Sequence, residues 1–375
     1  MTYLDYAATT PVDKRVLESF DRTCLEYIGN PNSLHSEGVK AKKLMEAAVN
    51  QVASLLGVKD DEVIFTSGAT EANNLAIMGV VNKYKNRGKT IITTKLEHSS
   101  ILETVNYLEN NGYTIKYVKL DNNGQVDLDN LKELLDDDVI LVSICEVNSE
   151  IGIIENINEI GKILKDYSRI IFHVDGTGAI GKKHINLDNI DLYSFSAHKF
   201  YGLKGVGCLI KKESINLEPL LHGGKSQTIY RAGTPALPLI VSTARALKLV
   251  LSDLDYNMSY IKELSSKLKE GLSKIDGVMI NSNDYGISNI INFSVKGIKP
   301  ETLLHALEED EIFISTKTAC SDDDYSIGVY ELYNDMERAK TSLRISLSHL
   351  TKENEIDYFL NKLKEKVDKL KSINS

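Results

Sequence analysis

The chain has 375 residues, of which 42% are hydrophobic and 26% charged, a composition typical of a globular protein with a sizeable core. A formal net charge of −9 without a basic stripe argues against nucleic-acid binding, and no apolar run is long enough to span a membrane. Four widely spaced cysteines, Cys24, Cys145, Cys208 and Cys320, predict neither a disulfide framework nor a metal site. We expect a cytoplasmic protein without a signal peptide.

The first sixty residues combine a short arm with two helical patterns. Residues 1–13 mix aromatic, small and hydroxyl side chains and read most simply as an arm tied to the core. Helices are expected over 14–27 and 36–56, with a turn rich in Asn, Pro and Ser at 30–35 between them.

From residue 62 onwards, short β-rich runs alternate with helical patterns. Strands are expected at 62–66, 90–94, 113–119, 139–146 and 169–174, with a further apolar run at 190–193, and helices at 69–84, 99–110, 128–135 and 157–167. This alternation predicts βαβ crossovers and an α/β fold with a mainly parallel sheet. In such sheets ligands bind beyond the carboxyl ends of the strands, so the chemistry is expected there.

The pattern changes near residue 253. Two long helical patterns, 235–252 and 260–275, precede strands at 278–281, 289–295, 312–315 and 342–347 and helices at 300–309 and 352–370. We predict a large domain over 14–252 and a smaller α+β domain made of residues 1–13 and 253–375.

Polar residues follow several of the expected strands. The glycine turn at 65–74 opens a helix, which suits either a bound phosphate or an ordinary capped turn. His98 is a candidate helix cap or catalyst, and Asn148 a candidate Asx turn or ligand contact. Asp175 ends a buried strand, where a carboxylate needs a partner: a helix cap, an ion pair or a protonated pyridine nitrogen.

Lys199 lies in the run Ser-Phe-Ser-Ala-His-Lys-Phe-Tyr-Gly, among hydroxyls, a histidine and a glycine. This setting indicates an amine that forms a Schiff base with a carbonyl cofactor. Asp175 lies about one βα unit earlier, a separation that can place the two on opposite sides of one ring. A phosphate turn, a histidine, an aspartate and a lysine in sheet order together fit pyridoxal 5′-phosphate (PLP).

Longer runs carry a family resemblance that covers nearly the whole chain. They are YLDYAATTP from residue 3, NPNSLH from 30, FTSGATEANN from 65, EHS from 97, NSEIG from 148, HVD from 173, DLYSFSAHK from 191, RAGT from 231, AC from 319 and SLRIS from 342. The sequence resembles the cysteine desulfurase family, the NifS/IscS-like branch of class V fold-type-I PLP enzymes. The resemblance implies a large domain with a mainly parallel seven-stranded sheet, and a homodimer.

The resemblance also implies the roles of the cofactor-binding residues. Lys199 would carry PLP as a Schiff base, His98 would stack on the ring and move protons, and Asp175 would pair with the pyridine nitrogen. Asn148 would contact the ring oxygen and the substrate. The phosphate would be held by Ala69, Thr70, Ser196 and His198, and by Thr234 of the second subunit.

Arg344 and Cys320 would act on the substrate, L-cysteine. The resemblance implies that Arg344 binds the substrate carboxylate and that Cys320 takes the sulfur as a persulfide, releasing L-alanine. The residues around Cys320 are polar, as an exposed nucleophile requires. Lys317 would favour its thiolate, and the acidic residues 322–324 would oppose it.

Three departures from the family pattern stand out. Gly178 occupies the place of a glutamine that bonds the cofactor's phenolic oxygen, and Asn148 and Thr177 are candidates to replace that bond. The run 225–230 differs from the usual Gln-Glu-Arg-Gly context, and Lys317 replaces a glycine before Cys320.

These observations predict a PLP-dependent cysteine desulfurase that passes persulfide sulfur to an acceptor protein, either an iron–sulfur scaffold or a tRNA-thiolation enzyme. The alternatives are a lyase for selenocysteine or a cysteine derivative, and a non-catalytic homologue kept as a partner-binding protein.

Overall fold

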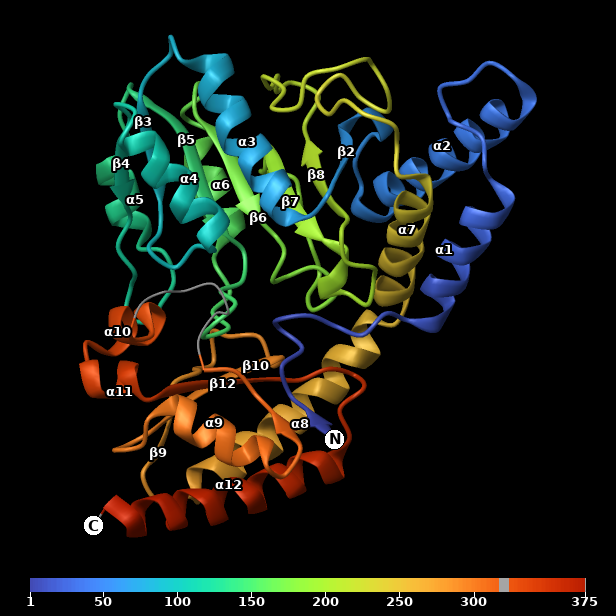
Figure 1. Cartoon of the computed structure of the whole chain (residues 1–375). Coiled ribbons are helices and arrows are strands. Elements are labelled where there is room, and N and C mark those ends of the chain that lie inside the picture. Colours follow the sequence, from blue (N-terminus) through green and yellow to red (C-terminus); the bar gives the residue numbers. More distant parts are fainter. Residues whose placement is uncertain (317–323, 375) are drawn as a thin grey trace.

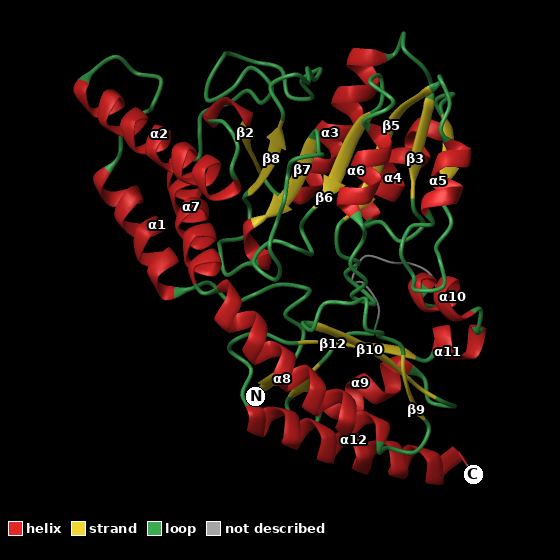
Figure 2. Ribbon diagram, turned by 180° about the vertical axis from the view of Figure 1, so that it is seen from behind, coloured by secondary structure: helices red, strands yellow, loops and turns green. Residues whose placement is uncertain are grey.

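The computed structural model describes residues 1–316 and 324–374. Its largest element is a seven-stranded sheet covered by helices, and a smaller group of strands and helices lies below the sheet in Figure 1. The parallel strands of the large sheet point their carboxyl ends toward the smaller group, as Figure 2 shows from behind.

The large sheet has the order β2-β8-β7-β6-β5-β3-β4. Its strands are β2 (Val63–Thr66), β3 (Thr90–Thr93), β4 (Thr114–Tyr117), β5 (Val139–Cys145), β6 (Ile171–Asp175), β7 (Leu192–Ser196) and β8 (Gly207–Lys211). β8 runs antiparallel to both of its neighbours, β2 and β7, whereas β7, β6, β5, β3 and β4 pair in parallel. The predicted mainly parallel α/β class is therefore confirmed, and β8 is the strand whose bounds the hydrophobic pattern did not give.

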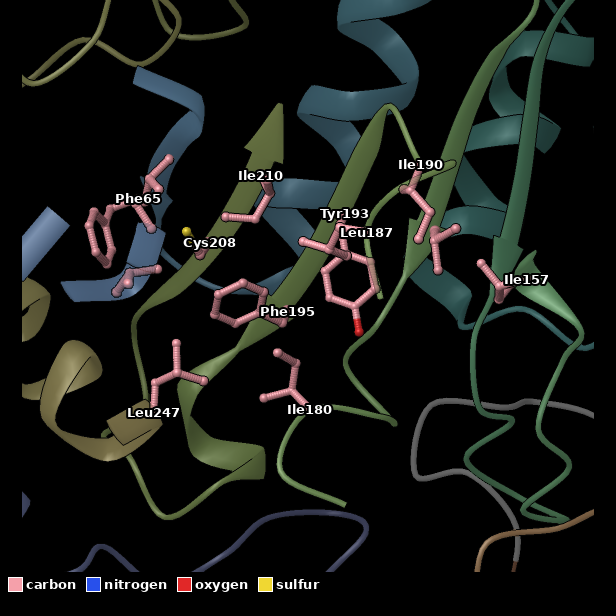
Figure 3. Packing of buried hydrophobic residues seen from close by; sticks show 14 of the residues in the cluster. Phe65, Ile157, Ile180, Leu187, Ile190, Tyr193, Phe195, Cys208, Ile210 and Leu247 are labelled. Carbon is pink, nitrogen blue, oxygen red and sulfur yellow. The ribbon is translucent and has the colours of Figure 1, made fainter. Parts of the chain in front are cut away.

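Helices cover both faces of this sheet. They are α1 (Lys14–Glu26), α2 (Ser36–Leu56), α3 (Ala69–Tyr84), α4 (Ser99–Glu109), α5 (Leu128–Leu134), α6 (Ile157–Leu164) and α7 (Leu237–Ser252). Successive strand residues face opposite sides: Phe65 packs with Phe195 and Leu247 of α7, and Ile64 packs with the apolar side of α3. Figure 3 shows the first of these faces, with Tyr193 and Phe195 pointing into it from β7.

The smaller group contains a three-stranded antiparallel sheet. β10 (Ile290–Val295) pairs with β9 (Val278–Ile280) and β12 (Ser342–Ser346), and β1 (Thr2–Tyr3) pairs in parallel with β11 (Ile312–Phe313). Its helices are α8 (Leu254–Ser273), α9 (Pro300–Glu308), α10 (Ile327–Tyr333), α11 (Met336–Lys340) and α12 (Glu353–Asn374). α8 begins directly after α7, at Leu254 rather than at the expected residue 260, because neither proline nor glycine interrupts the chain there. The predicted division near residue 253 stays a prediction.

The N-terminal arm connects the two sheets. The Leu4 carbonyl accepts a hydrogen bond from Ser346 N–H of β12 (2.7 Å), and Thr10 N–H donates to the carbonyl of His198 after β7 (2.9 Å). The arm therefore crosses the space that separates the large sheet from the small one. Across 1–316 and 324–374, no helix combines the length and apolar character needed to cross a bilayer.

Candidate active site

A cavity of about 650 Å³ lies at the carboxyl edge of the large sheet. Its lining includes most of the residues predicted from the sequence, namely Ala69, Thr70, His98, Asp175, Ser196, His198, Lys199 and Arg344. They come from α3, β6, β7, the turn after β7, the start of α4, and β12. The fold thus brings together side chains that are more than 270 positions apart, from Ala69 to Arg344.

Lys199 lies in a short 3₁₀ turn, η2 (Ala197–Lys199), that directly follows β7. Its Nζ donates hydrogen bonds to the carbonyl oxygens of Ala7 (2.5 Å) and Ala8 (2.9 Å). The arm therefore helps to position the amine at the cavity, a role that the plain reading of residues 1–13 did not include. Both alanines line the same cavity.

Asp175 ends β6 and is only 5% exposed. Its Oδ1 accepts the Thr177 N–H (2.9 Å), and its Oδ2 accepts a bond from Asn73 Nδ2 on α3 (2.8 Å). Asn73 Nδ2 also donates to Ser100 Oγ (2.9 Å). Asn73 lies within one of the runs that carry the family resemblance, but no role was predicted for it. Its position one turn after the start of α3 could have indicated that it lies near the carboxyl edge of the large sheet.

His98 caps α4, which confirms one of its two sequence interpretations, and it also lines the cavity, whereas its catalytic role stays a prediction. Its Nδ1 accepts the Ser100 N–H (3.1 Å), which leaves the proton of the neutral ring on Nε2. Burial lowers the pKa of His98, and the nearby Asp175 opposes this while Lys199 adds to it. A neutral imidazole at this place can donate a proton from Nε2 or stack on a ring.

The start of α3 offers an anion site. Gly68 precedes the helix and supplies no side-chain cap, so the first N–H groups of α3 are left for another acceptor. Ser196 and His198 line the cavity beside this turn, and burial lowers the pKa of His198 to about 4, which keeps the ring neutral. A Cβ at Gly207 would lie 2.6 Å from the backbone of Gly68, so glycine there allows β8 to approach the turn.

Arg344 enters the cavity from β12 and is 2% exposed. Its Nη2 forms an ion pair with Asp5 Oδ1 (2.7 Å), and its Nη1 donates to the Ser149 carbonyl (2.8 Å). Its Nε has no hydrogen-bond partner among the described residues. Arg344 also exchanges backbone hydrogen bonds with Ser315. Asp5 was not singled out from the sequence.

Three predicted residues stand apart from this set. Asn148 is buried, but its Nδ2 donates to the Leu96 carbonyl and its Oδ1 accepts the N–H groups of Glu150 and Ile151, and it is not part of the cavity lining. Thr234 is exposed and likewise outside the lining, and its role in a second subunit stays a prediction. Cys320 lies outside the described residues.

Two departures noted in the sequence have a structural setting. A Cβ at Gly178 would lie 2.5 Å from the Val147 carbonyl oxygen, so this backbone leaves no room for the glutamine of the family pattern. In the altered run 225–230, the amide of Gln227 donates to the Val63 carbonyl of the edge strand β2 (2.8 Å). Arg231, just after it, forms an ion pair with Glu71 of α3 (3.0 Å). The altered run is thus attached to the sheet edge.

Comparison with known proteins identifies the family of this fold. The aminotransferase class-V family matches residues 2–359. A cysteine desulfurase IscS of Dictyoglomus turgidum is 39% identical over 99% of this chain and 95% of its own length. The solved structure of a NifS-like protein has a TM-score of 0.93 and 37% identity, covering 98% of this chain and 99% of its own. A NifS-like protein from Rickettsia africae has a TM-score of 0.88 and 31% identity, with coverage of 98% and 99%.

The sheet, the cavity at its carboxyl edge and these matches define a fold-type-I enzyme of the aminotransferase class-V family, to which the chain belongs. Within that class, its full-length similarity makes it a member of the cysteine desulfurase family of the NifS/IscS type.

Proposed function

We propose that this protein is a PLP-dependent cysteine desulfurase that converts L-cysteine to L-alanine and keeps the sulfur as a persulfide on Cys320. The observation that carries the proposal is that Lys199, Asp175, His98 and Arg344 line a single cavity. An amine, a buried carboxylate, an imidazole and a guanidinium meet there, which is the set that a cofactor ring and an amino-acid substrate require.

The residues present fit PLP. Asp175 is buried and held by two hydrogen-bond donors, and no cation pairs with it in the described ranges, so a protonated ring nitrogen would complete its environment. The uncapped start of α3, with Ser196 and His198 beside it, would hold the phosphate. When bound, PLP withdraws electrons from the substrate Cα and so permits proton removal and loss of sulfur.

The chain's own side chains would then orient the substrate and move protons. Lys199 Nζ would hold the cofactor and is the amine that would move a proton at the substrate Cα. Nε2 of His98 carries a proton that it could donate at the same cavity. Arg344 orients the substrate carboxylate through guanidinium hydrogen bonds.

Sulfur transfer would use Cys320, which lies between β11 and α10 in the sequence. Its thiolate forms an S–S bond with the substrate sulfur as the C–S bond breaks, and the electron pair of that bond remains on carbon, which takes a proton. One cysteine and one thiol thus yield one alanine and one persulfide, without an added oxidant. The persulfide sulfur would pass to an acceptor protein of iron–sulfur assembly or tRNA thiolation.

We also propose a homodimer whose second subunit covers the surface between residues 31–34 and 225–230. This hollow has a volume of about 1040 Å³, and Leu34 on its rim is 97% exposed. An apolar side chain so exposed favours a protein contact. Thr234 of the partner would then complete the phosphate site.

A cytoplasmic location is also proposed. The free cysteines Cys24, Cys145 and Cys208 are consistent with a reducing compartment.

Alanine and sulfide release from L-cysteine in the presence of a thiol tests the proposal. We expect the wild-type protein to form both, the Cys320→Ser variant to form little sulfide, and a Cys24→Ser control to match the wild type, because Cys24 is exposed on α1. Sulfide release at the normal rate by Cys320→Ser would rule out the persulfide step. Faster turnover of selenocysteine, independent of Cys320, would favour the lyase instead.

A further inference from the structure

Lys182 lines the active-site cavity, although no sequence motif singled it out. It follows β6 by one turn, and its Nζ donates to the Gly178 carbonyl (3.2 Å). The residue is half-buried, and it lines the same cavity as the ring residues and Arg344.

The charges around Lys182 leave it uncompensated. Within the described ranges no carboxylate lies at ion-pair distance from its Nζ, and the charged groups that act on it are the cations Lys199 and Arg344. The charge of Lys182 also lowers the pKa of His198, whose ring is neutral at physiological pH. Burial lowers the pKa of Lys182 to about 7, and the two neighbouring cations act in the same direction. An anion at this place would raise the pKa and be held by the ammonium group.

Arg344 presents the opposite situation. Its charge is already paired with Asp5 at 2.7 Å, and its other terminal nitrogen donates to a backbone carbonyl. A substrate carboxylate that approaches Arg344 therefore meets a cation whose field is largely cancelled. Attraction of a substrate carboxylate to the cavity therefore needs a second cation, one that no carboxylate pairs with in the described ranges. Lys182 is such a cation.

We propose that Lys182 is a second binding residue for the substrate carboxylate: Arg344 sets the orientation of that group and Lys182 supplies the uncompensated charge that attracts it. The proposal rests on the proposed function, because it takes an amino acid as the ligand. Gly178 is part of the same arrangement, because its carbonyl accepts the hydrogen bond from Lys182 Nζ and its backbone has no room for a Cβ.

The test compares Lys182→Gln with wild type in the cofactor-loaded enzyme. The KM for L-cysteine is expected to rise about tenfold, the effect of one charge-assisted hydrogen bond, with kcat changed less than threefold. Lys182→Arg, which keeps the charge, should restore most of the affinity. Lys162→Gln is the matched control, since Lys162 is an exposed lysine of α6 paired with Glu159, and it should leave KM unchanged.

Binding of unreactive ligands separates this inference from the activity itself. 3-Mercaptopropionate has the thiol and carboxylate of the substrate, and 2-mercaptoethanol has its thiol without a carboxylate or an amine. Calorimetry should show that Lys182→Gln weakens 3-mercaptopropionate about tenfold and leaves 2-mercaptoethanol unchanged. Equal changes for both ligands, or none, would overturn the role of Lys182 even if cysteine is turned over. Absent turnover by wild type would instead refute the proposed function.

The pH dependence of the same binding provides a check that does not need the Gln variant to fold. Affinity of the wild type for 3-mercaptopropionate should fall as the pH rises through the pKa of Lys182, since the amine loses its charge. In Lys182→Arg the fall should be absent up to pH 10, because guanidinium stays charged. Identical profiles would assign the titration to another group and refute the proposal.

Discussion

The two walls of the cavity are built in different ways. On the wall formed by the carboxyl edge of the large sheet, short side chains are fixed by neighbouring donors: Asp175 accepts bonds from Thr177 N–H and Asn73, and His98 accepts one from Ser100 N–H. On the opposite wall, Arg344 reaches into the cavity from β12 and is held by Asp5.

This difference matches what each wall must do. A ring that stays bound through every turnover is best served by groups that need no rearrangement, which is how preorganised sites lower barriers. A substrate that enters and leaves has to exchange hydrogen bonds with the protein at each cycle, and an arginine that already holds a carboxylate can exchange it for another. We therefore expect substitutions on the first wall to change kcat and the visible spectrum, and those on the second to change KM.

The largest effect is expected for Lys199→Ala on the first wall. Activity should fall by roughly a thousandfold or more, because the covalent link and the amine that moves the proton are both lost. The absorbance band of the bound cofactor should shift or disappear, while the unfolding midpoint stays within a few degrees. Retention of normal turnover would show that another amine carries the cofactor.

Arg344→Lys tests the second wall. An ammonium group cannot reproduce the guanidinium fork, so the KM for L-cysteine should rise by about one to two orders of magnitude, with a smaller change in kcat. Steady-state kinetics measure the split. A fall confined to kcat would place Arg344 with the ring residues and remove the contrast between the walls.

Asn73→Ala should give a smaller effect on the first wall. It removes one hydrogen bond of about 1 kcal/mol from Asp175, which corresponds to a loss of about fivefold in kcat with little change in KM. The control is Asn74→Ala on the same helix, because the Asn74 amide bonds Thr70 and Thr104 rather than Asp175. Equal losses in the two variants would indicate a general effect on α3.

Glu155→Gln probes the loop between β5 and α6, which contributes Val147 to one wall and Ser149 to the other. Burial raises the pKa of Glu155 to about 8, and its carboxyl accepts the Val126 N–H (2.8 Å). Between these two pKa values the Glu155 carboxyl is protonated in the native protein, whereas it is ionised in the unfolded chain, where its pKa is near 4.5. The wild-type free energy of unfolding should thus fall from about pH 5 to 8, by up to about 1.4 kcal/mol per pH unit. Denaturant titrations should show a flatter dependence in the variant.

The wall formed by the carboxyl edge of the large sheet was largely predictable from the sequence. Its residues follow strands directly, and parallel strands bring their carboxyl ends to one edge, so Asp175, His98 and Lys199 converge for topological reasons. The surroundings of Arg344 and the position of Lys182 were harder to predict from the sequence. Asp5, Ser149 and Lys182 come from an arm, a loop and a turn, whose paths no periodic pattern encodes. Asn148 was predicted to contact the ring oxygen, but its amide nitrogen donates to the Leu96 carbonyl and its amide oxygen accepts the N–H groups of Glu150 and Ile151.

By itself, the sequence determined the α/β class, the order of strands and helices, and the residue types that chemistry on a carbonyl cofactor needs, because local periodicity and strand-end positions are properties of neighbouring residues. Only the tertiary structure decided that the arm would hold Lys199, that Asp5 would pair with Arg344, and that Lys182 would line the cavity with no carboxylate at ion-pair distance among residues 1–316 and 324–374. Those contacts join segments separated by many residues, and the packing of the whole chain determines which charges end up paired.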